Sequence, residues 1–190
     1  MASPVNQQKL LSIQIQKIKQ GDGRAFEELF YAYCKPLIHF ANRYLQDVHL
    51  AENVVQDVFL HVWEKREKLD PSLNIKTYLY TAVKNNALKQ LRHQDIRRKH
   101  EHFIKKQDLT IHSAEEQWQQ KETEQQILNA IEKLPPKCQL IFSMNRFDGL
   151  TYAEIAEVEG ISIKTVETQM GRALKSLRKQ LSHLLTSILF

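Results

Sequence analysis

The sequence of 190 residues is 42% hydrophobic and 26% charged, with five glycines, five prolines and a formal net charge of +5. This length and composition suit one domain or two small ones with real hydrophobic cores, and so few helix-breaking residues predict an all-α fold. The sequence argues against a membrane-spanning chain, because no uninterrupted apolar segment approaches roughly 20 residues, while the positive charge favours a polyanionic partner.

The first half of the chain predicts three helices before its first long loop. A helix from Val5 to Gln20 ends at Gly21-Asp22-Gly23, where a new helix starts. The second helix carries an apolar stripe between Phe26 and Tyr44, and Pro36 should kink it or leave a local defect. The third follows Asp47, a capping candidate, and pairs a very apolar face with an acidic and polar edge. By itself this edge indicates no more than a solvated face.

A loop over residues 68–75, which contains Asp70-Pro71-Ser72, precedes a long basic helix. Between Lys84 and Lys106 eight basic residues stand against two acidic ones. The start of this helix also carries aromatic and amide side chains, namely Tyr78, Tyr80, Asn85 and Asn86. Basic charge interleaved with such groups suits a single-stranded nucleic acid, and a solvated charge run is the equally open alternative.

The sequence offers no set of residues for a metal, a cofactor or catalysis. His93, His100 and His102 lie close together, but no cysteine or carboxylate set completes a metal site. Cys34 and Cys138 are far apart in the sequence, which favours two reduced thiols. No phosphate-binding glycine loop or nucleophile elbow is present. We therefore expect a protein that is not an enzyme, and the lack of a signal peptide leads us to expect it in the cytoplasm.

The second half begins with a polar, glutamine-rich stretch that we interpret as a linker. It runs from about Gln107 to Gln126 and contains a capping box at residues 113–116, where a helix should begin. The apolar stripe of that helix ends at Pro135-Pro136. A further helix is expected over residues 137–147.

Residues 149–174 have the pattern of a helix-turn-helix. Thr151 and Glu154 form a capping box, Gly160 supplies the turn, and Ser162 caps a second helix. The inward positions of that helix are predicted to be Val166, Met170 and Leu174. Its outward residues can contact base edges and phosphates in a major groove, and they are Lys164, Thr165, Glu167, Thr168, Gln169 and Arg172. The alternative is an ordinary αα-hairpin with a solvated polar face.

Four blocks of sequence, in this order, resemble the extracytoplasmic-function group of bacterial RNA polymerase sigma factors. They are GDGRAFEELF, AENVVQDVFLHVWEKR, TYLYTAVKNNALKQLR and LPPKCQLIFSMNRFDGLTYAEIAEVEGISIKTVETQMGRALKSLR. The resemblance covers roughly residues 21–181. It implies two small helical bundles joined by a flexible linker: a region-two domain over residues 1–104, the linker over 105–120 and a region-four domain over 121–190.

The resemblance implies that the first bundle docks on the clamp helices of the polymerase β′ subunit and opens promoter DNA at the minus-ten element. The polymerase-binding residues would be Glu52, Asn53, Gln56 and Asp57, supported by Phe59 and Trp63. The contacts to the minus-ten element would come from Tyr78, Lys84, Asn85, Lys89 and Arg92. The loop over residues 68–75 would capture a flipped-out base. Asn53 and Lys89 depart from the family, which usually has an acid at the first position and Asp or Asn at the second.

The resemblance also implies that the second bundle places residues 164–172 in the major groove of the minus-thirty-five element and meets the polymerase β flap. Its implied partners are core RNA polymerase, promoter DNA and an anti-sigma factor, with no cofactor and no membrane insertion. A conventional transcription regulator, with a sensory helical domain before its helix-turn-helix, explains the second half equally well. It leaves the basic and aromatic helix of the first half unexplained.

Overall fold

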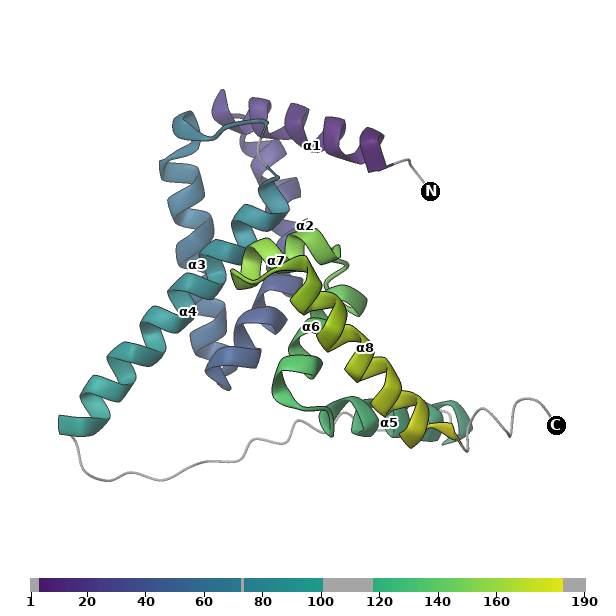
Figure 1. The fold of residues 1–190 in the computed structure, drawn as a ribbon. Helices are drawn as coiled ribbons and strands as arrows, with labels where there is room; N and C mark the ends of the chain where they lie inside the picture. The colour runs from purple at the N-terminus through teal and green to yellow at the C-terminus, as the bar shows by residue number, and fades with distance from the viewer. Residues whose placement is uncertain (1–3, 73, 101–117, 183–190) are drawn as a thin grey trace. The chain divides into compact units, whose positions relative to one another are not determined.

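The structure is a computed structural model, and it describes residues 4–72, 74–100 and 118–182. Every regular element in these ranges is a helix, as Figure 1 shows. The chain divides into two compact units, one carrying α1 to α4 and the other carrying α5, α6, α8 and most of α7. The predicted all-α fold with two helical bundles is therefore confirmed. The capping box at residues 113–116 and most of the predicted linker lie outside the described residues.

The first unit is built from four α-helices and one short 3-10 helix. These are α1 (Pro4–Lys19), α2 (Gly23–Leu45), α3 (Val48–Glu64), η1 (Arg66–Lys68) and α4 (Ile75–His100). Helix α2 packs against α3, while α1 packs on α2 and on η1. Side chains from α2 and α4 meet in the core, where the rings of Phe40 and Tyr80 lie 4.9 Å apart at their centroids. Pro36 lies inside α2, which continues through it as one helix.

Short polar side chains begin the helices of this unit. Asp22 accepts hydrogen bonds from the backbone N–H groups of Arg24 and Ala25 at the start of α2. Asp47 accepts one from Leu50 at the start of α3, as its predicted capping role requires. The sequence did not identify the cap of α4, where the Asn74 side chain accepts from the N–H groups of Lys76 and Thr77. Each cap satisfies backbone donors that the helix itself leaves free.

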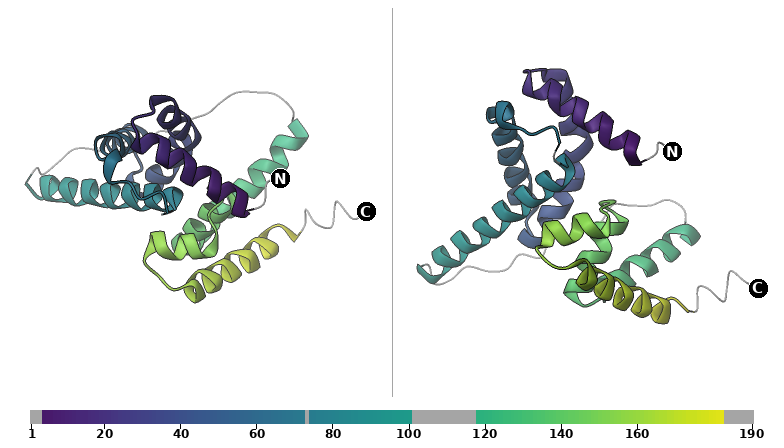
Figure 2. Two further views of the ribbon diagram at one scale, coloured as in Figure 1. Left: turned by 90° about the horizontal axis from the view of Figure 1, so that it is seen from above. Right: turned by 45° about the horizontal axis from the view of Figure 1, so that its top comes forward.

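The second unit consists of α5 (Trp118–Glu132), α6 (Pro136–Arg146), α8 (Ile163–Gln180) and most of α7 (Tyr152–Glu159). Helix α6 packs along α8, and α5 meets the end of α8, where Gln180 Nε2 lies 3.5 Å from the carbonyl oxygen of Ala130. The two views in Figure 2 show α6 and α8 side by side. Pro135 and Pro136 separate α5 from α6, as predicted, with Pro136 in the first turn of α6.

The core of the second unit differs in one position from the predicted inward set. Val166 and Met170 are buried, as expected, but the next buried residue of α8 is Ala173. Leu174 is only half-buried. Ala173 is buried in its place, so the inward stripe follows residues 166, 170, 173 and 177.

Candidate nucleic-acid interface

The helix-turn-helix of the second unit is held by the caps that its sequence predicts. Glu154 accepts from the backbone N–H of Thr151 at 2.8 Å, and Thr151 Oγ1 accepts from the N–H of Glu154 at 3.2 Å, so the capping box is complete. Gly160 adopts a φ of 67°, the left-handed conformation expected of the turn. Ser162 Oγ accepts from the N–H of Thr165 at 3.1 Å and starts α8. These local bonds fix the angle at which α8 leaves the turn.

The predicted DNA-binding face of α8 is polar and largely open to solvent. Val166, Met170, Ala173 and Leu177 pack inward along one side of the helix. Five of the six predicted contact residues are exposed on the other side, and they are Lys164, Thr165, Glu167, Thr168 and Arg172. These side chains offer hydrogen-bond donors, acceptors and one fork-shaped cation, which is the chemistry that base edges and phosphates require.

Two hydroxyl groups on this face already have partners within the helix. Thr168 Oγ1 donates to the carbonyl oxygen of Lys164 at 2.8 Å. Thr165 Oγ1 lies 2.8 Å from Ser162 Oγ. Their methyl groups are consequently held in fixed directions. In a major groove, a threonine methyl group can make an apolar contact with the methyl group of thymine.

Gln169 differs from the other predicted contact residues because it is half-buried. It lies where the polar face of α8 meets the side that packs on α6. There the thiol of Cys138, which is 2% exposed, donates to Gln169 Oε1 at an S···O distance of 3.1 Å. This bond could not be predicted from the sequence, because its two partners lie 31 positions apart in different helices.

The basic helix α4 presents a second polar face, in the first unit. Asn85, Lys89 and Arg92 are exposed, and Tyr78 is 38% exposed. Their spacing of seven, four and three residues places these four side chains on one face of the helix. Lys84 precedes Asn85 by one position. The basic residues that follow residue 93 lie where the structure describes no side chains.

Two of the aromatic and amide residues at the start of α4 do not contribute to this face. Tyr80 is 1% exposed and belongs to the core, so the expectation that its ring takes part in the nucleic-acid surface is wrong. Tyr78 and Tyr80 have the same side chain, so only their positions on the helix distinguish the exposed ring from the buried one. Asn86 is exposed, but its Nδ2 donates to the carbonyl oxygen of Ala82 at 3.1 Å. The face therefore carries one tyrosine and one asparagine.

The third helix carries the predicted polymerase-binding residues along one exposed stripe. Asn53, Gln56 and Asp57 are exposed, and Glu52 is half-buried. The stripe continues to Leu60, an apolar side chain that is 57% exposed. Leu60 was not among the predicted site residues. Its position already falls outside the spacing of the buried residues of α3, and this spacing indicates an exposed leucine.

Beside this stripe lies an apolar groove of about 320 Å³ between α2 and α3. The rings of Phe26 and Trp63 are 5.0 Å apart, and those of Phe30 and Phe59 are 4.9 Å apart. The full lining is Gly23, Phe26, Phe30, Gln56, Phe59, Leu60 and Trp63. Phe59 and Trp63 line the groove next to Gln56. Their role in supporting a polymerase contact stays a prediction.

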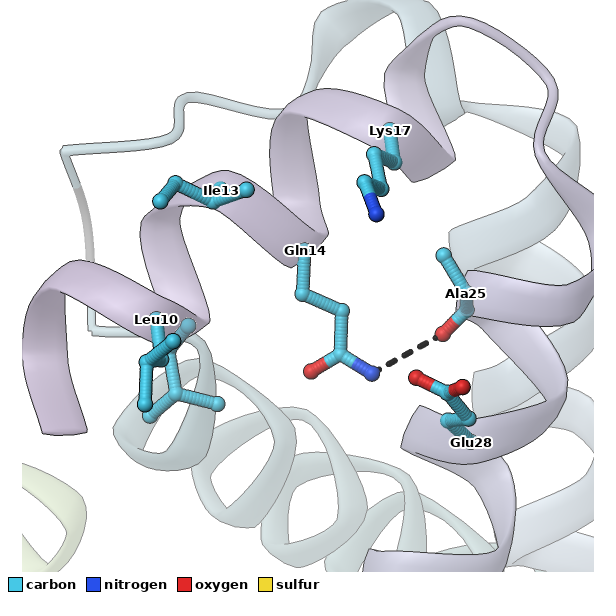
Figure 3. Close-up of a pocket in the computed structure, with 7 residues that line it drawn as sticks. Leu10, Ile13, Gln14, Lys17, Ala25 and Glu28 are labelled. Carbon is cyan, nitrogen blue, oxygen red and sulfur yellow. Dashed lines mark hydrogen bonds between the residues drawn. The ribbon is translucent and has the colours of Figure 1, made fainter.

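A second hollow, of about 330 Å³, lies between α1 and α2. Figure 3 shows Gln14 pointing into it, with its Nε2 donating to the carbonyl oxygen of Ala25 at 3.0 Å. Leu10 and Ile13 line the same hollow and are 63% and 47% exposed. Helix α1 thus buries Ile15 and Ile18 and leaves Leu10 open to solvent.

The loop before α4 contains a short hydrogen-bonded turn. Asp70 Oδ1 accepts from the backbone N–H of Ser72 at 2.9 Å and from its hydroxyl at 2.7 Å. These two bonds hold the pKa of Asp70 below its ordinary value, because they favour the charged carboxylate. Lys19 Nζ donates to the carbonyl oxygen of Leu69 and ties the loop to α1. The turn predicted from Asp70-Pro71-Ser72 is confirmed.

Neither cysteine is paired with the other. Burial raises the pKa of the Cys34 thiol, and the carboxylate of Glu52 raises it further. Within the residues that the structure describes, no group of three His, Cys, Asp or Glu side chains could hold a metal ion. None of the described helices has both the length and the apolar character needed to cross a bilayer.

Comparison with protein families gives two matches in one chain. Residues 29–96 match the family described as Sigma-70 region 2, and residues 124–177 match Sigma-70, region 4. The first match contains the exposed faces of α3 and α4, and the second contains the helix-turn-helix. Together they span more than half of the chain.

Curated relatives match most of the chain. The ECF RNA polymerase sigma factor SigW of Bacillus subtilis is 26% identical over an alignment of 188 positions, and this alignment covers 92% of this chain and 98% of that protein. The ECF RNA polymerase sigma factor RpoE of Cereibacter sphaeroides is 28% identical, over 85% of this chain and 88% of its own. The ferric citrate uptake sigma factor FecI of Escherichia coli is 28% identical, over 79% and 87% respectively.

Two solved structures share the fold. The sigma factor RpoE of Bartonella quintana, determined in complex with the anti-sigma factor NepR, has a TM-score of 0.63 and 22% identity, and covers 83% of this chain and 96% of its own. CnrH, determined in complex with the cytosolic domain of CnrY, has a TM-score of 0.61 and 20% identity, over 91% and 97%.

Proposed function

The chain belongs to the sigma-70 family, and we propose that it is an extracytoplasmic-function sigma factor that binds core RNA polymerase and directs promoter recognition, DNA melting and transcription initiation. The observation that carries this function is the order of the two matched regions, region 2 before region 4, in one chain. Each region brings a helix whose exposed polar face suits nucleic acid. Such a factor is not itself a catalyst, and it works in the cytoplasm, where the chromosome and the polymerase are.

The exposed stripe of α3 is the proposed docking surface for the clamp helices of the polymerase β′ subunit. Asn53, Gln56 and Asp57 supply its polar part, Glu52 flanks it, and Leu60 adds an apolar anchor. Interfaces of this kind gain most of their affinity from a few apolar anchors in a desolvated centre, while the surrounding polar groups fix the register. The adjoining groove between α2 and α3 supports this assignment, because it offers a recess for an apolar side chain of the partner.

The face of α4 formed by Tyr78, Asn85, Lys89 and Arg92 is the proposed minus-ten reader, with Lys84 beside it. An aromatic ring can stack on an unpaired base, an amide can pair with its edge, and the cations attract the phosphates. Unstacking a base costs a few kcal/mol, so a single strand must be held once it is open. The loop over residues 68–75 is the proposed pocket for such a base.

Helix α8 is the proposed reader of the minus-thirty-five element. Its exposed residues, with Gln169 at their edge, fit the major groove, and the basic residues of its last turn, Arg178 and Lys179, suit phosphates. The proposed second polymerase contact of this unit is the β flap. An anti-sigma factor that covers the DNA-binding faces is the proposed inhibitor.

The competing function is that of a conventional regulator, which binds duplex DNA without polymerase. The match of residues 29–96 to Sigma-70 region 2 favours the sigma factor, since a sensory domain has no need of that region. The exposed basic face of α4 argues in the same direction.

The test is a pull-down with purified core RNA polymerase, followed by run-off transcription on a pool of genomic promoters. We expect stoichiometric binding and new transcription start sites that require the protein. Tight binding to duplex DNA by the protein alone, with no retention on polymerase, would instead establish a conventional regulator.

A further inference from the structure

The bond between Cys138 and Gln169 bears on which base α8 selects. Gln169 lies between Thr165 and Arg172 along α8, at the border of the exposed polar face. A free glutamine side chain can rotate its amide, and it then offers either its oxygen or its NH₂ group to a base. The thiol of Cys138, buried beneath this side chain at the contact between α6 and α8, favours one of these two orientations.

The chemistry of the pair determines which end of the amide turns inward. A thiol is a weak donor and a weaker acceptor, whereas an amide oxygen accepts strongly. The favoured arrangement is therefore S–H to oxygen, as the contact of 3.1 Å between Cys138 Sγ and Gln169 Oε1 has it. With Oε1 bonded to the thiol, the NH₂ group is the end of the amide that remains for a base. Within the described chain no hydrogen bond engages Nε2, so both of its N–H groups are available to DNA.

We propose that Cys138 is a positioning residue that fixes the Gln169 amide with its NH₂ group outward, so that α8 selects guanine over adenine at one base pair of the upstream promoter element. Guanine presents two acceptors, N7 and O6, in the major groove. Adenine presents N7 beside the N6 amino donor, and glutamine pairs with it through both its oxygen and its NH₂ group. An amide whose oxygen is bonded to the thiol must give up that bond before it can make the double contact. The proposal rests on the proposed function, and it concerns the identity of the base that α8 selects.

The experiment uses polymerase holoenzyme containing the full chain and a promoter library randomised over the upstream element. Transcripts are sequenced to give the base preference at each position, and polymerase retention is measured in parallel. Gln169→Met, which keeps the length of the side chain and removes its amide, identifies the base pair that Gln169 reads. Wild-type holoenzyme should favour guanine over adenine there by about tenfold, the discrimination expected of one good base contact.

The Cys138 variants then test the positioning role. Cys138→Ala removes the donor, so the amide can rotate and the preference should fall to about threefold or less, or shift to adenine. Cys138→Ser keeps a donor and should retain the wild-type preference. In the Gln169→Met background neither substitution should change the preference at this position. A lost packing contact alone would weaken transcription equally on all templates and would leave the base preference unchanged.

Several outcomes would overturn the proposal. An adenine preference in the wild type would show that the amide presents both of its ends. Equal preferences in the wild type and Cys138→Ala would show that the thiol does not orient it, and an unchanged profile for Gln169→Met would show that Gln169 reads no base. Should Cys138→Ala fail to fold, Cys138→Val supplies a bulkier side chain without a donor, and the wild-type preference still decides between guanine and adenine. Failure of the wild-type holoenzyme to initiate anywhere in the library would count against the proposed function instead.

Discussion

Single residues on α3 and α4 should separate polymerase binding from DNA melting. Asp57 lies on the exposed stripe of α3, so Asp57→Lys reverses a charge in the proposed interface with the clamp helices. We expect the Kd for core polymerase to rise by about tenfold or more in a titration at fixed salt. A tenfold rise corresponds to a loss of about 1.4 kcal/mol of binding free energy. Glu132→Lys, an exposed site on α5 with the same change of charge, is the control. Unchanged affinity of Asp57→Lys would move the interface to another face.

Asn85 is expected to act after the polymerase has bound. Asn85→Ala removes the amide that the proposed minus-ten face offers to an unpaired base, so open complexes should form about tenfold less well while polymerase retention stays the same. Permanganate footprinting of the promoter measures the open complexes. The matched control is Asn86→Ala, since the neighbouring amide is bonded to the carbonyl oxygen of Ala82. Equal loss in both variants would argue against base reading by Asn85.

The thiol of Cys34 should be slow to react at neutral pH. Burial and the charge of Glu52 raise the pKa of Cys34. The protonated thiol therefore still dominates at a pH equal to the pKa of an ordinary cysteine. We expect alkylation by iodoacetamide, followed by peptide mass spectrometry, to be slower than that of free cysteine and to accelerate as the pH rises. Glu52→Gln removes the smaller of the two causes and should shift the rate profile to lower pH. A profile unmoved by this substitution would exclude the carboxylate as a cause.

At the scale of the element, the helix-turn-helix contains two glycines that should respond to substitution in opposite ways. Gly160 has a φ of 67° and no atom within 4 Å of an added Cβ, so Gly160→Ala meets backbone strain alone. It should destabilise the helix-turn-helix by about 1–2 kcal/mol. Gly171 lies inside α8 with equally open surroundings, and Gly171→Ala should stabilise by about 0.5–1 kcal/mol. Chemical denaturation measures both, and stabilisation by Gly160→Ala would contradict the left-handed turn.

The caps of these elements explain why the sequence predicted their starts so well. An N-cap is decided within three or four residues, so Asp47, Thr151 and Ser162 could be identified without tertiary contacts. Asn74 caps α4 in the same way but was not predicted, because the turn at Asp70-Pro71-Ser72 lies only two residues before it. Pro36 is the reverse case. A proline disfavours the helix around it, but the packing of α2 on α3 and α4 keeps the helix continuous.

At the scale of the whole molecule, the two units should fold without each other. Fragments 1–104 and 105–190 each keep an apolar core of their own, and the proposed division places every described helix in one fragment or the other. We expect the circular dichroism spectra of the two fragments to sum to that of the full chain, and each fragment to unfold cooperatively. A fragment that is unfolded alone would show that the division into residues 1–104, 105–120 and 121–190 is incorrect.

The sequence by itself determined the all-α class, the order of the helices, the caps of the helix-turn-helix and the family. These depend on local spacing and on motifs in a fixed order, and both can be read along the chain. Tertiary structure decided which of two similar residues is buried: Tyr80 is buried while Tyr78 is exposed, and Ala173 takes the core position predicted for Leu174. It also decided which side chains bond to one another, as Cys138 and Gln169 do. The reason is physical. Burial and side-chain bonding depend on the neighbouring helix, and periodicity within one helix does not specify that neighbour.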